Sequence, residues 1–281
     1  MSMLAEHTAI LIADRIGARP ADHHATAELA SRVERRAAAL GLGAREYAAR
    51  LAAETAPSDG PSDGPSDGPS DGWLDGELGH LAAPLTNGWT WLWRDQPALD
   101  ALCAELAGRA PGRPVALWVA GCSTGEEAYG AAIAALAAGL DARVLGTDID
   151  VARLAIARRA VYGAHALRRT PPRVLERYFE PAPNGQRRLA REVRERVEIL
   201  QHNLLAPAPL RAGGWDAIVC RNVLLHCSAG AQRRIRERIE AALRTGGRAL
   251  YGATERLRLE PAVEPTLPRA MAPRATAPRA T

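Results

Sequence analysis

Short apolar segments alternate with longer amphipathic segments over the second half of the chain, and this alternation restricts the possible folds more than any other feature. Apolar segments of this length are typical of buried strands, and the amphipathic segments between them supply crossover helices, so neighbouring strands pair in parallel. The expected strands cover residues 115–120, 143–147, 197–200, 216–220 and 248–252. The sequence therefore predicts an α/β fold with a doubly wound, mostly parallel sheet.

The C-terminal part of this pattern predicts one more helix and then a loss of regular structure. In residues 234–243, Ile235, Ile239 and Leu243 mark one helix face, and glycines follow before the last expected strand. An open sheet of this kind often ends in an antiparallel hairpin. Residues 261–281 are rich in proline, alanine and arginine, so we expect a disordered tail and a short or missing hairpin.

The first quarter of the chain has a different character. Residues 1–55 are expected to form a small helical domain, because Leu29, Val33 and Leu40 recur at helical spacing. The tetrapeptide PSDG then occurs four times in residues 57–72. Such a polar, proline- and glycine-rich segment cannot bury enough apolar surface to offset the entropy of ordering. Residues 56–75 are therefore expected to be a disordered linker, and residues 76–260 the α/β domain.

Composition limits the class of protein. A chain of 281 residues that is 47% apolar can build a substantial core, and no apolar segment approaches the roughly 20 residues of a membrane span. The four cysteines lack zinc-site spacing and are expected to be reduced and buried. The net charge of +4 comes from scattered basic residues without aromatic interleaving. We expect a cytoplasmic, monomeric protein that neither binds nucleic acid nor inserts into membranes.

The first expected strand leads into a candidate cofactor site. The sequence ALWVAGCSTGEEAYGAAIAAL predicts a buried strand, a turn at residues 121–125 and a helix. Asp148 follows the second expected strand, where its carboxylate can accept hydrogen bonds from both ribose hydroxyls. This layout, with the ligand across the carboxyl ends of parallel strands, indicates a cofactor that contains adenosine.

The turn itself argues against a dinucleotide. A pyrophosphate needs a glycine-rich turn without a competing anion at the helix N-terminus, whereas Glu126 and Glu127 place two negative charges there. Both charges suit the helix dipole and a ligand with a cationic ammonium group. S-adenosylmethionine has an ammonium group and no phosphate, so it fits where NAD does not. Alternatively, both glutamates only belong to the exposed first turn of the helix.

Five motifs follow one another in order: GCSTGEEAY, TDID, NLL, CRNVLLH and GGRALYGATE. In this order they resemble the CheR-type methyltransferases, and the resemblance extends back through LTNGWTWLWRD to cover about residues 8–257. It implies a class I, Rossmann-like methyltransferase that uses S-adenosylmethionine to methylate glutamate side chains of chemotaxis receptors. It also implies a short β-subdomain within residues 162–196.

Matching the family's motifs assigns residues to the cofactor. They all lie just before the first expected strand or just after a strand end, and they are Thr90, Arg94, Glu127, Asp148, Asn203, Leu204, Asn222 and Val223. The resemblance implies that Glu127 holds the methionine part and Asp148 the ribose. Asn203 and Leu204 would lie on the adenine side, and Asn222 and Val223 near the sulfonium. Both asparagines could instead cap turns, and Leu204 and Val223 would be buried in any fold.

The same matching suggests two catalytic residues. Methyl transfer to a carboxylate is an in-line displacement at carbon, so it needs neither a metal nor a strong base, and catalysis rests on proximity and a dry, closed site. Arg94 is expected to orient the carboxylate or hold the closed state, with His226 as a second contact. His226 replaces a tyrosine of the family. It is a working substitute, a structural histidine or a sign of a changed substrate.

A partner surface is suggested by the helical domain. Arg32, Arg35 and Arg36 are spaced to lie on one helix face, opposite the expected apolar stripe. In the family, a basic face here contacts the glutamate-bearing helical bundle of the receptor, so the same contact is implied. A solvated surface is the alternative. The stretch within residues 162–196 lacks the glycine-rich loop of relatives that grip a receptor tail, which favours tail-independent recognition.

Two other functions remain open at this point. One is a non-catalytic relative that binds S-adenosylmethionine for regulation, which the change to His226 and the PSDG repeat would favour. The other is a methyltransferase of the same fold that acts on a small molecule or RNA. The absence of a basic, aromatic-rich surface argues against RNA, and the helical N-terminal domain argues against a small molecule.

Overall fold

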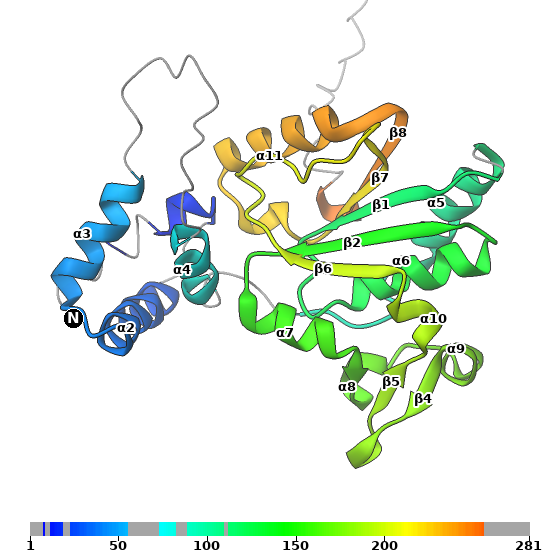
Figure 1. The fold of residues 1–281 in the computed structure, drawn as a ribbon, viewed down its shortest axis with the longest axis horizontal. Coiled ribbons are helices and arrows are strands. Elements are labelled where there is room, and N and C mark those ends of the chain that lie inside the picture. Colours follow the sequence, from blue (N-terminus) through cyan, green and yellow to red (C-terminus); the bar gives the residue numbers. More distant parts are fainter. Residues whose placement is uncertain are drawn as a thin grey trace, which may run out of the picture.

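The structure is a computed structural model that describes residues 8, 12–18, 23–55, 73–82, 89–109 and 112–255. Within these residues the chain forms an N-terminal helical unit, an α/β domain and a small β-subdomain (Figure 1). The expected PSDG linker and the expected disordered tail lie outside the described residues, except that the predicted linker range overlaps the start of a helix at Trp73.

The described part of the α/β domain contains a five-stranded sheet in the order β6-β2-β1-β7-β8, in which each neighbouring pair is parallel. The predicted α/β fold with a doubly wound parallel sheet is confirmed. The strands are β1 (Val115–Ala120), β2 (Ala142–Asp148), β6 (Val197–Gln201), β7 (Trp215–Cys220) and β8 (Leu243–Tyr251). The winding reverses between β1 and β7, so a ligand crevice is expected at their carboxyl ends.

Helices cover both faces of this sheet (Figure 1). The side chains of β1 alternate between the faces: Leu117 and Val119 pack into one buried cluster, while Trp118 and Ala120 pack into another. The first cluster includes residues of α5, α6 and α7, and the second includes Ile235 and Ile239 of α11. The bounds of these helices are Gln96–Arg109 for α5, Glu126–Ala137 for α6, Val151–Arg159 for α7 and Ala229–Ala242 for α11. All four cysteines are buried, as expected, and none of them forms a disulfide bond.

The end of the sheet differs from the prediction. Helix α11 starts earlier than expected and ends at Ala242, and Leu243 pairs with Trp215 as the first residue of β8. The register between these strands is irregular before the pair Ala217 and Arg248. Leu243 therefore belongs to the sheet rather than to the helix face. The expected short or missing hairpin concerns residues beyond 255, which lie outside the described part of the chain.

The N-terminal helical unit consists of α2 (His23–Ala39), α3 (Ala44–Thr55) and α4 (Trp73–Leu81) together with the short helical segment at residues 12–15. Its core is separate from the two clusters of the α/β domain and contains Ile12, Leu29, Val33, Tyr47, Leu51, Leu78 and Leu81. The predicted domain boundary at residue 76 falls inside α4. Leu40 follows α2 and is 38% exposed, so it lies outside the apolar stripe. Among the described residues, no helix is both long and apolar enough to span a membrane.

The β-subdomain is an antiparallel sheet in the order β3-β5-β4, and it begins one residue before the range 162–196 where the family resemblance implies one. Its elements are β3 (Val161–Tyr162), α8 (Ala164–Leu167), α9 (Pro172–Tyr178), β4 (Phe179–Pro181), η2 (Pro183–Gly185) and β5 (Arg187–Leu189), and α10 (Arg191–Arg194) follows. The subdomain touches the segment before α5, because the backbone N–H of Leu92 donates to the carbonyl of Ala166 at 2.9 Å. The β-subdomain thus borders the crevice.

Candidate functional site

Two adjoining cavities lie at the carboxyl ends of β1, β2 and β7. The first cavity is lined by residues of the segment before α5 and of the first turn of α6, and the second by Asp148 and residues 202–204. Gly121, Ser123 and Asn222 line both, so these residues form a shared wall. Gly121 has a φ of +82°, and a Cβ atom there would lie 2.3 Å from Cγ2 of Val223. Only glycine allows the turn to pass so close to Val223, which lies just after β7.

The first cavity brings together the residues predicted for the methionine part of the cofactor. Thr90 and Arg94 come from the segment before α5, and Glu127 comes from the first turn of α6. The Glu127 carboxylate therefore lines a cavity, and the alternative that it only belongs to an exposed helix turn does not hold. Its position at the positive end of α6 also favours its charged form.

Aromatic and cationic side chains form the rim of the first cavity. Arg94 donates from Nη1 to the carbonyl of Trp89 at 2.8 Å, and its Cζ lies 4.8 Å from the centre of the Trp91 ring. Arg168, which follows α8, also places its Cζ over this ring, at 4.3 Å. Trp89 is 69% exposed. The Trp91 ring, which lines the cavity, thus holds two cations, of which Arg94 also lines the cavity.

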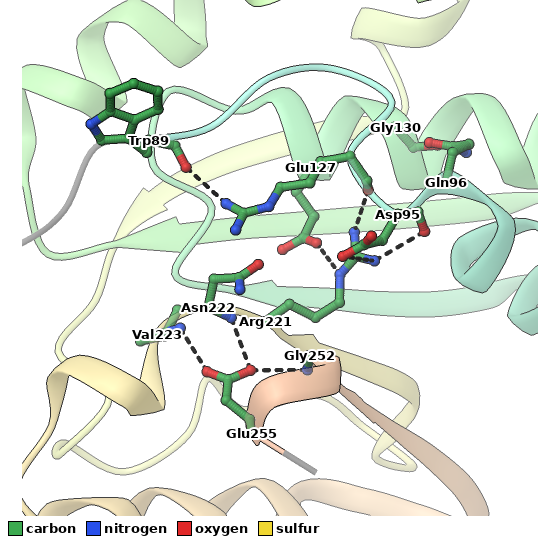
Figure 2. A network of polar contacts seen from close by, with 11 residues as sticks. Trp89, Asp95, Gln96, Glu127, Gly130, Arg221, Asn222, Val223, Gly252 and Glu255 are labelled. Atoms are coloured by element: carbon green, nitrogen blue, oxygen red, sulfur yellow. Dashed lines mark hydrogen bonds and ion pairs between the residues drawn. The ribbon is translucent and has the colours of Figure 1, made fainter. Parts of the chain in front are cut away.

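Arg221, which the sequence analysis did not assign, links the parts of the first cavity (Figure 2). It follows β7 directly, and its side chain is only 3% exposed. Its Nε forms an ion pair with Glu127. Its Nη1 and Nη2 donate to the carbonyls of Asp95 and Arg94 at 3.1 and 3.0 Å. A charge placed directly after the apolar residues 217–220 at the end of a buried strand must find partners inside the protein, and this was the available signal.

Burial raises the pKa of Glu127 above its ordinary value. The positive charges of Arg221 and Arg94 oppose this shift, and the negative charge of Glu255 adds to it. Burial likewise raises the pKa of Asp148 and of Glu126, although hydrogen bonds oppose both shifts. The cavities therefore hold carboxylates that gain from a cation or a hydrogen-bond donor on a ligand.

The second cavity contains Asp148, the residue predicted for the ribose. One of its oxygens accepts from the backbone N–H of Ser123 at 2.8 Å, and the other accepts from that of Asp150 at 3.0 Å. These bonds fix the carboxylate at the end of β2. Each carboxylate oxygen has a second lone pair, so Asp148 can still accept hydrogen bonds from a diol.

Asn203 and Leu204, which were expected on the adenine side, also line the second cavity, and so does Val223, which was expected near the sulfonium. Asn203 has a structural role too, because its Oδ1 accepts from the N–H of Leu205 at 3.0 Å and its Nδ2 donates to the carbonyl of Arg15 at 3.2 Å. Asn203 therefore caps a turn, as the alternative proposed, and it also lines the cavity.

Arg94 and His226, the two predicted catalytic residues, line different cavities. Arg94 lines the first, and His226 lines the second, with Asp148 and Arg153. Burial lowers the pKa of His226 below its ordinary value of 6.5, so the imidazole is neutral at neutral pH. The structure thus brings each residue to the site but does not bring the two together in one cavity.

Glu255 is a second residue that the sequence analysis missed. It is buried, and its carboxylate accepts hydrogen bonds from the backbone N–H groups of Asn222, Val223 and Gly252 (Figure 2) and from that of Leu224, all at 2.8 to 2.9 Å. It therefore fixes the wall shared by the cavities. No local pattern could reveal this role, because the acceptor and three of its donors lie about 30 residues apart in the chain.

Two buried polar atoms in the first cavity have no hydrogen-bond partner within the described residues. They are Oγ of Ser123 and Oε1 of Gln96, whose residues are 9% and 1% exposed. Buried polar atoms are nearly always hydrogen-bonded in folded proteins, so Ser123 Oγ, in the wall shared by both cavities, indicates a polar ligand, whereas Gln96 Oε1 lies against Gly130 of α6. A ligand with an ammonium and a carboxylate at one end and a ribose at the other matches Glu127, Ser123 and Asp148. The residues present therefore fit S-adenosylmethionine.

The predicted basic face of the helical unit needs correction. Arg36 points to Glu77 of α4 and binds its carboxylate with two hydrogen bonds, at 2.8 and 2.6 Å. Arg32 and Arg35 both pair with Glu28, at 3.1 and 3.3 Å. The buried carboxylate of Glu77 needs a cation, and Arg36 supplies it. Arg36 thus belongs to the contact between α2 and α4. Only Arg32 and Arg35 remain on the predicted face.

Comparison with known proteins identifies relatives. Residues 89–271 match the family described as CheR methyltransferase, SAM binding domain. Chemotaxis protein methyltransferase 2 of Pseudomonas aeruginosa is 37% identical over 180 residues, which are 61% of this chain and 64% of that protein. "Probable biofilm formation methyltransferase WspC" of Pseudomonas putida is 35% identical over 174 residues, 59% of this chain and 41% of that protein. Chemotaxis protein methyltransferase 1 of Pseudomonas aeruginosa is 32% identical over 190 residues, 62% of this chain and 68% of that protein.

The share of each protein that is covered decides what these matches show. The chain spans less than two thirds of the length of the first two relatives. The family match covers well over half of the 281 residues and includes most residues that line both cavities. The chain therefore belongs to the CheR methyltransferase family.

Proposed function

We propose that the protein transfers the methyl group of S-adenosylmethionine to glutamate side chains of chemotaxis-type receptors, in the cytoplasm, and forms glutamate methyl esters. The observation that carries the proposal is the placement of Glu127 and Asp148 in adjoining cavities that share one wall. One carboxylate suits an ammonium group and the other a ribose. The relatives named chemotaxis protein methyltransferases support the substrate class.

In this proposal the first cavity binds the methionine part and the second binds adenosine. Thr90, Arg94 and Glu127 surround the amino-acid end, and Asp148 accepts hydrogen bonds from the ribose hydroxyls. Asn203 and Leu204 contact the adenine side. Asn222 and Val223 lie near the sulfonium, which accords with Asn222 lining both cavities.

The chemistry asks little of the protein beyond positioning. S-adenosylmethionine supplies a methyl group that a carboxylate oxygen can attack in line, with the electron pair of the broken carbon–sulfur bond leaving on sulfur. A glutamate side chain is already ionised at neutral pH, so no residue has to remove a proton. Arg94 attracts and orients the incoming carboxylate at the rim, where its guanidinium lies over Trp91.

The receptor surface is proposed to meet the protein at the rim of the first cavity and at α2. Arg32 and Arg35 remain candidates for contact with an acidic helical bundle, although each is paired with Glu28. Arg36 is left out because it binds Glu77. Since exposed ion pairs are weak, Glu28 can release these arginines to a more acidic partner at small cost.

The test is transfer of tritium from methyl-labelled S-adenosylmethionine to membranes that bear receptors of the source organism. A glutamate methyl ester releases the label as methanol in base, and this result is expected. Label that stays bound in base would indicate another acceptor and would contradict the proposal. Cofactor binding without any transfer would instead support a non-catalytic regulatory role.

Matched variants separate the proposed role of Arg94 from a general loss of positive charge. Arg94→Ala is expected to lose at least about 100-fold in transfer, which corresponds to about 3 kcal/mol of lost transition-state stabilisation. Arg173→Ala, on the exposed surface of α9, removes a similar charge and should keep full activity. Full turnover by the Arg94 variant would remove that residue from the mechanism.

A further inference from the structure

The side chain of Arg221 makes contacts to two separate parts of the first cavity. Its Nε pairs with Oε1 of Glu127 on α6, while Nη1 and Nη2 donate to the carbonyls of Asp95 and Arg94, just before α5 (Figure 2). The guanidinium is almost fully buried, so all three contacts are shielded from water. One planar group therefore holds both the carboxylate and the segment that carries Arg94.

The contact with Glu127 leaves that carboxylate half available. Arg221 binds Oε1, and no hydrogen bond joins Oε2 to any residue in the described part of the chain. A buried carboxylate that lacked a cation would tend to take up a proton and could not bind an ammonium group. Arg221 thus opposes the rise in the pKa of Glu127 that burial causes, and it leaves the second oxygen available to a cationic ligand.

The contacts with the carbonyls hold a turn that would otherwise be unfavourable. Trp93 and Asp95 have φ angles of +72° and +48°, in the left-handed region that residues other than glycine rarely adopt. Such a conformation persists only when surrounding contacts enforce it. Arg94 lies between these two residues, so the direction of its side chain depends on the turn that Arg221 holds.

We infer that Arg221 is a positioning residue that couples the two sides of the site: through Glu127 it prepares the cofactor's ammonium subsite, and through the Asp95 and Arg94 carbonyls it places Arg94. The inference rests on the proposed function for the identity of the cofactor and of the group that Arg94 meets. Arg221 itself touches neither in this scheme.

The first readout is the pH dependence of S-adenosylmethionine binding to the full chain, measured by calorimetry between about pH 5 and 7, where the ligand's ammonium stays protonated. Affinity should be high above the pKa of Glu127 and fall as the pH drops through it. Arg94 and Glu255 also act on Glu127, and Asp148 titrates in the second cavity. These three residues keep their identity in every Arg221 variant, and the displacement of Arg94 that the variants should cause is part of the coupling under test.

Arg221→Met and Arg221→Lys are the informative variants. The methionine removes the charge and should move the midpoint of the affinity loss upward by about one pH unit or more. The lysine keeps the charge and should leave the midpoint near that of the unmodified chain. Glu127→Gln should abolish this component of the pH dependence. An unchanged midpoint in a folded Arg221→Met variant would overturn the inference, because it would show that Arg221 does not control the charge of Glu127.

The second readout is hydrogen exchange of peptides that cover residues 89–99. Arg221→Lys cannot donate to both carbonyls and Glu127 in the geometry of the planar guanidinium, so exchange there should rise at least several-fold. Unchanged exchange would overturn the claim that Arg221 holds this turn, and this arm decides the question if Arg221→Met does not fold. Neither readout needs a methyl acceptor. Failure of receptor methylation would therefore be distinguishable from failure of this inference.

Discussion

Arg36 and Glu77 form a two-bond ion pair inside the N-terminal helical unit, and the hydroxyl of Tyr47 donates to the same carboxylate at 2.6 Å. Glu77 is only 3% exposed. Removal of one partner from a buried pair leaves the other charge without compensation, so Glu77→Ala should lower the free energy of unfolding by about 3 kcal/mol. Urea denaturation measures this. Glu34→Ala, which removes an exposed carboxylate of α2, should change it by less than about 0.5 kcal/mol.

The same carboxylate should make the helical unit sensitive to acid. Burial acts to raise the pKa of Glu77, but hydrogen bonds from Arg36 and Tyr47 outweigh it and hold the pKa below the ordinary value of 4.5. A lowered carboxyl pKa contributes stability that is present above the unfolded value and is lost as the pH falls through the folded value. The helical signal in circular dichroism should therefore drop as the pH falls below about 4.5. Glu77→Gln should be less stable at neutral pH and show a shallower acid dependence.

Sequence patterns were sufficient to predict an element where its structure is determined by residues close together in the chain. The strand Val115–Ala120 was predicted to the residue because an unbroken apolar run of that length, followed by a glycine turn and a helix, has few other structures. Arg36 was misplaced because its direction depends on Glu77, which lies 41 residues further along. Likewise, helical spacing assigned Leu243 to a helix face. This was wrong because Leu243 pairs with Trp215 of a neighbouring strand, which local spacing does not reveal.

Some residues of the candidate site were predicted and others were missed, again according to whether their contacts are local in the chain. Glu127 and Asp148 follow strand ends, and topology alone brings strand ends together. Arg221 and Glu255 were missed because their partners are backbone groups and a carboxylate from other elements, and such contacts leave no periodic signal. Motifs thus located residues that line the two cavities, whereas the residues that hold them in place became visible only in three dimensions.

Glu255 should be needed for the wall between the cavities. Glu255→Ala leaves the N–H groups of Asn222, Val223, Leu224 and Gly252 without their acceptor, and each unsatisfied buried donor costs about 1 to 3 kcal/mol. The variant should unfold at clearly lower urea concentration and bind S-adenosylmethionine more weakly. Thr254→Ala, at an exposed neighbouring position, should change neither property. Equal urea midpoints for Glu255→Ala and the unmodified chain would show that water replaces the carboxylate.

Asp148→Asn tests the second cavity. The amide keeps only one acceptor oxygen, so it cannot accept from both Ser123 and Asp150 and also from a ribose diol. Loss of hydrogen bonds to a charged acceptor predicts an affinity for S-adenosylmethionine about 10- to 100-fold weaker by calorimetry. Asp141→Asn, an exposed position at the opposite end of β2, should bind normally. Unchanged affinity in the Asp148 variant would place the ribose elsewhere.

His226 offers the sharpest distinction between the two cavities, because it was expected beside the methyl acceptor but lines the cavity of Asp148. If it serves the cofactor, His226→Ala should raise the KM for S-adenosylmethionine about tenfold and change kcat by less than about threefold, whereas Arg94→Ala should act mainly on kcat. Since burial lowers the pKa of His226 below 6.5, the unmodified chain should show no loss of activity from this group between pH 7 and 8, and protonation should matter only below 6.5. A fall in kcat with an unchanged KM for the cofactor would instead return His226 to the side of the glutamate, as the tyrosine that it replaces in related sequences suggests.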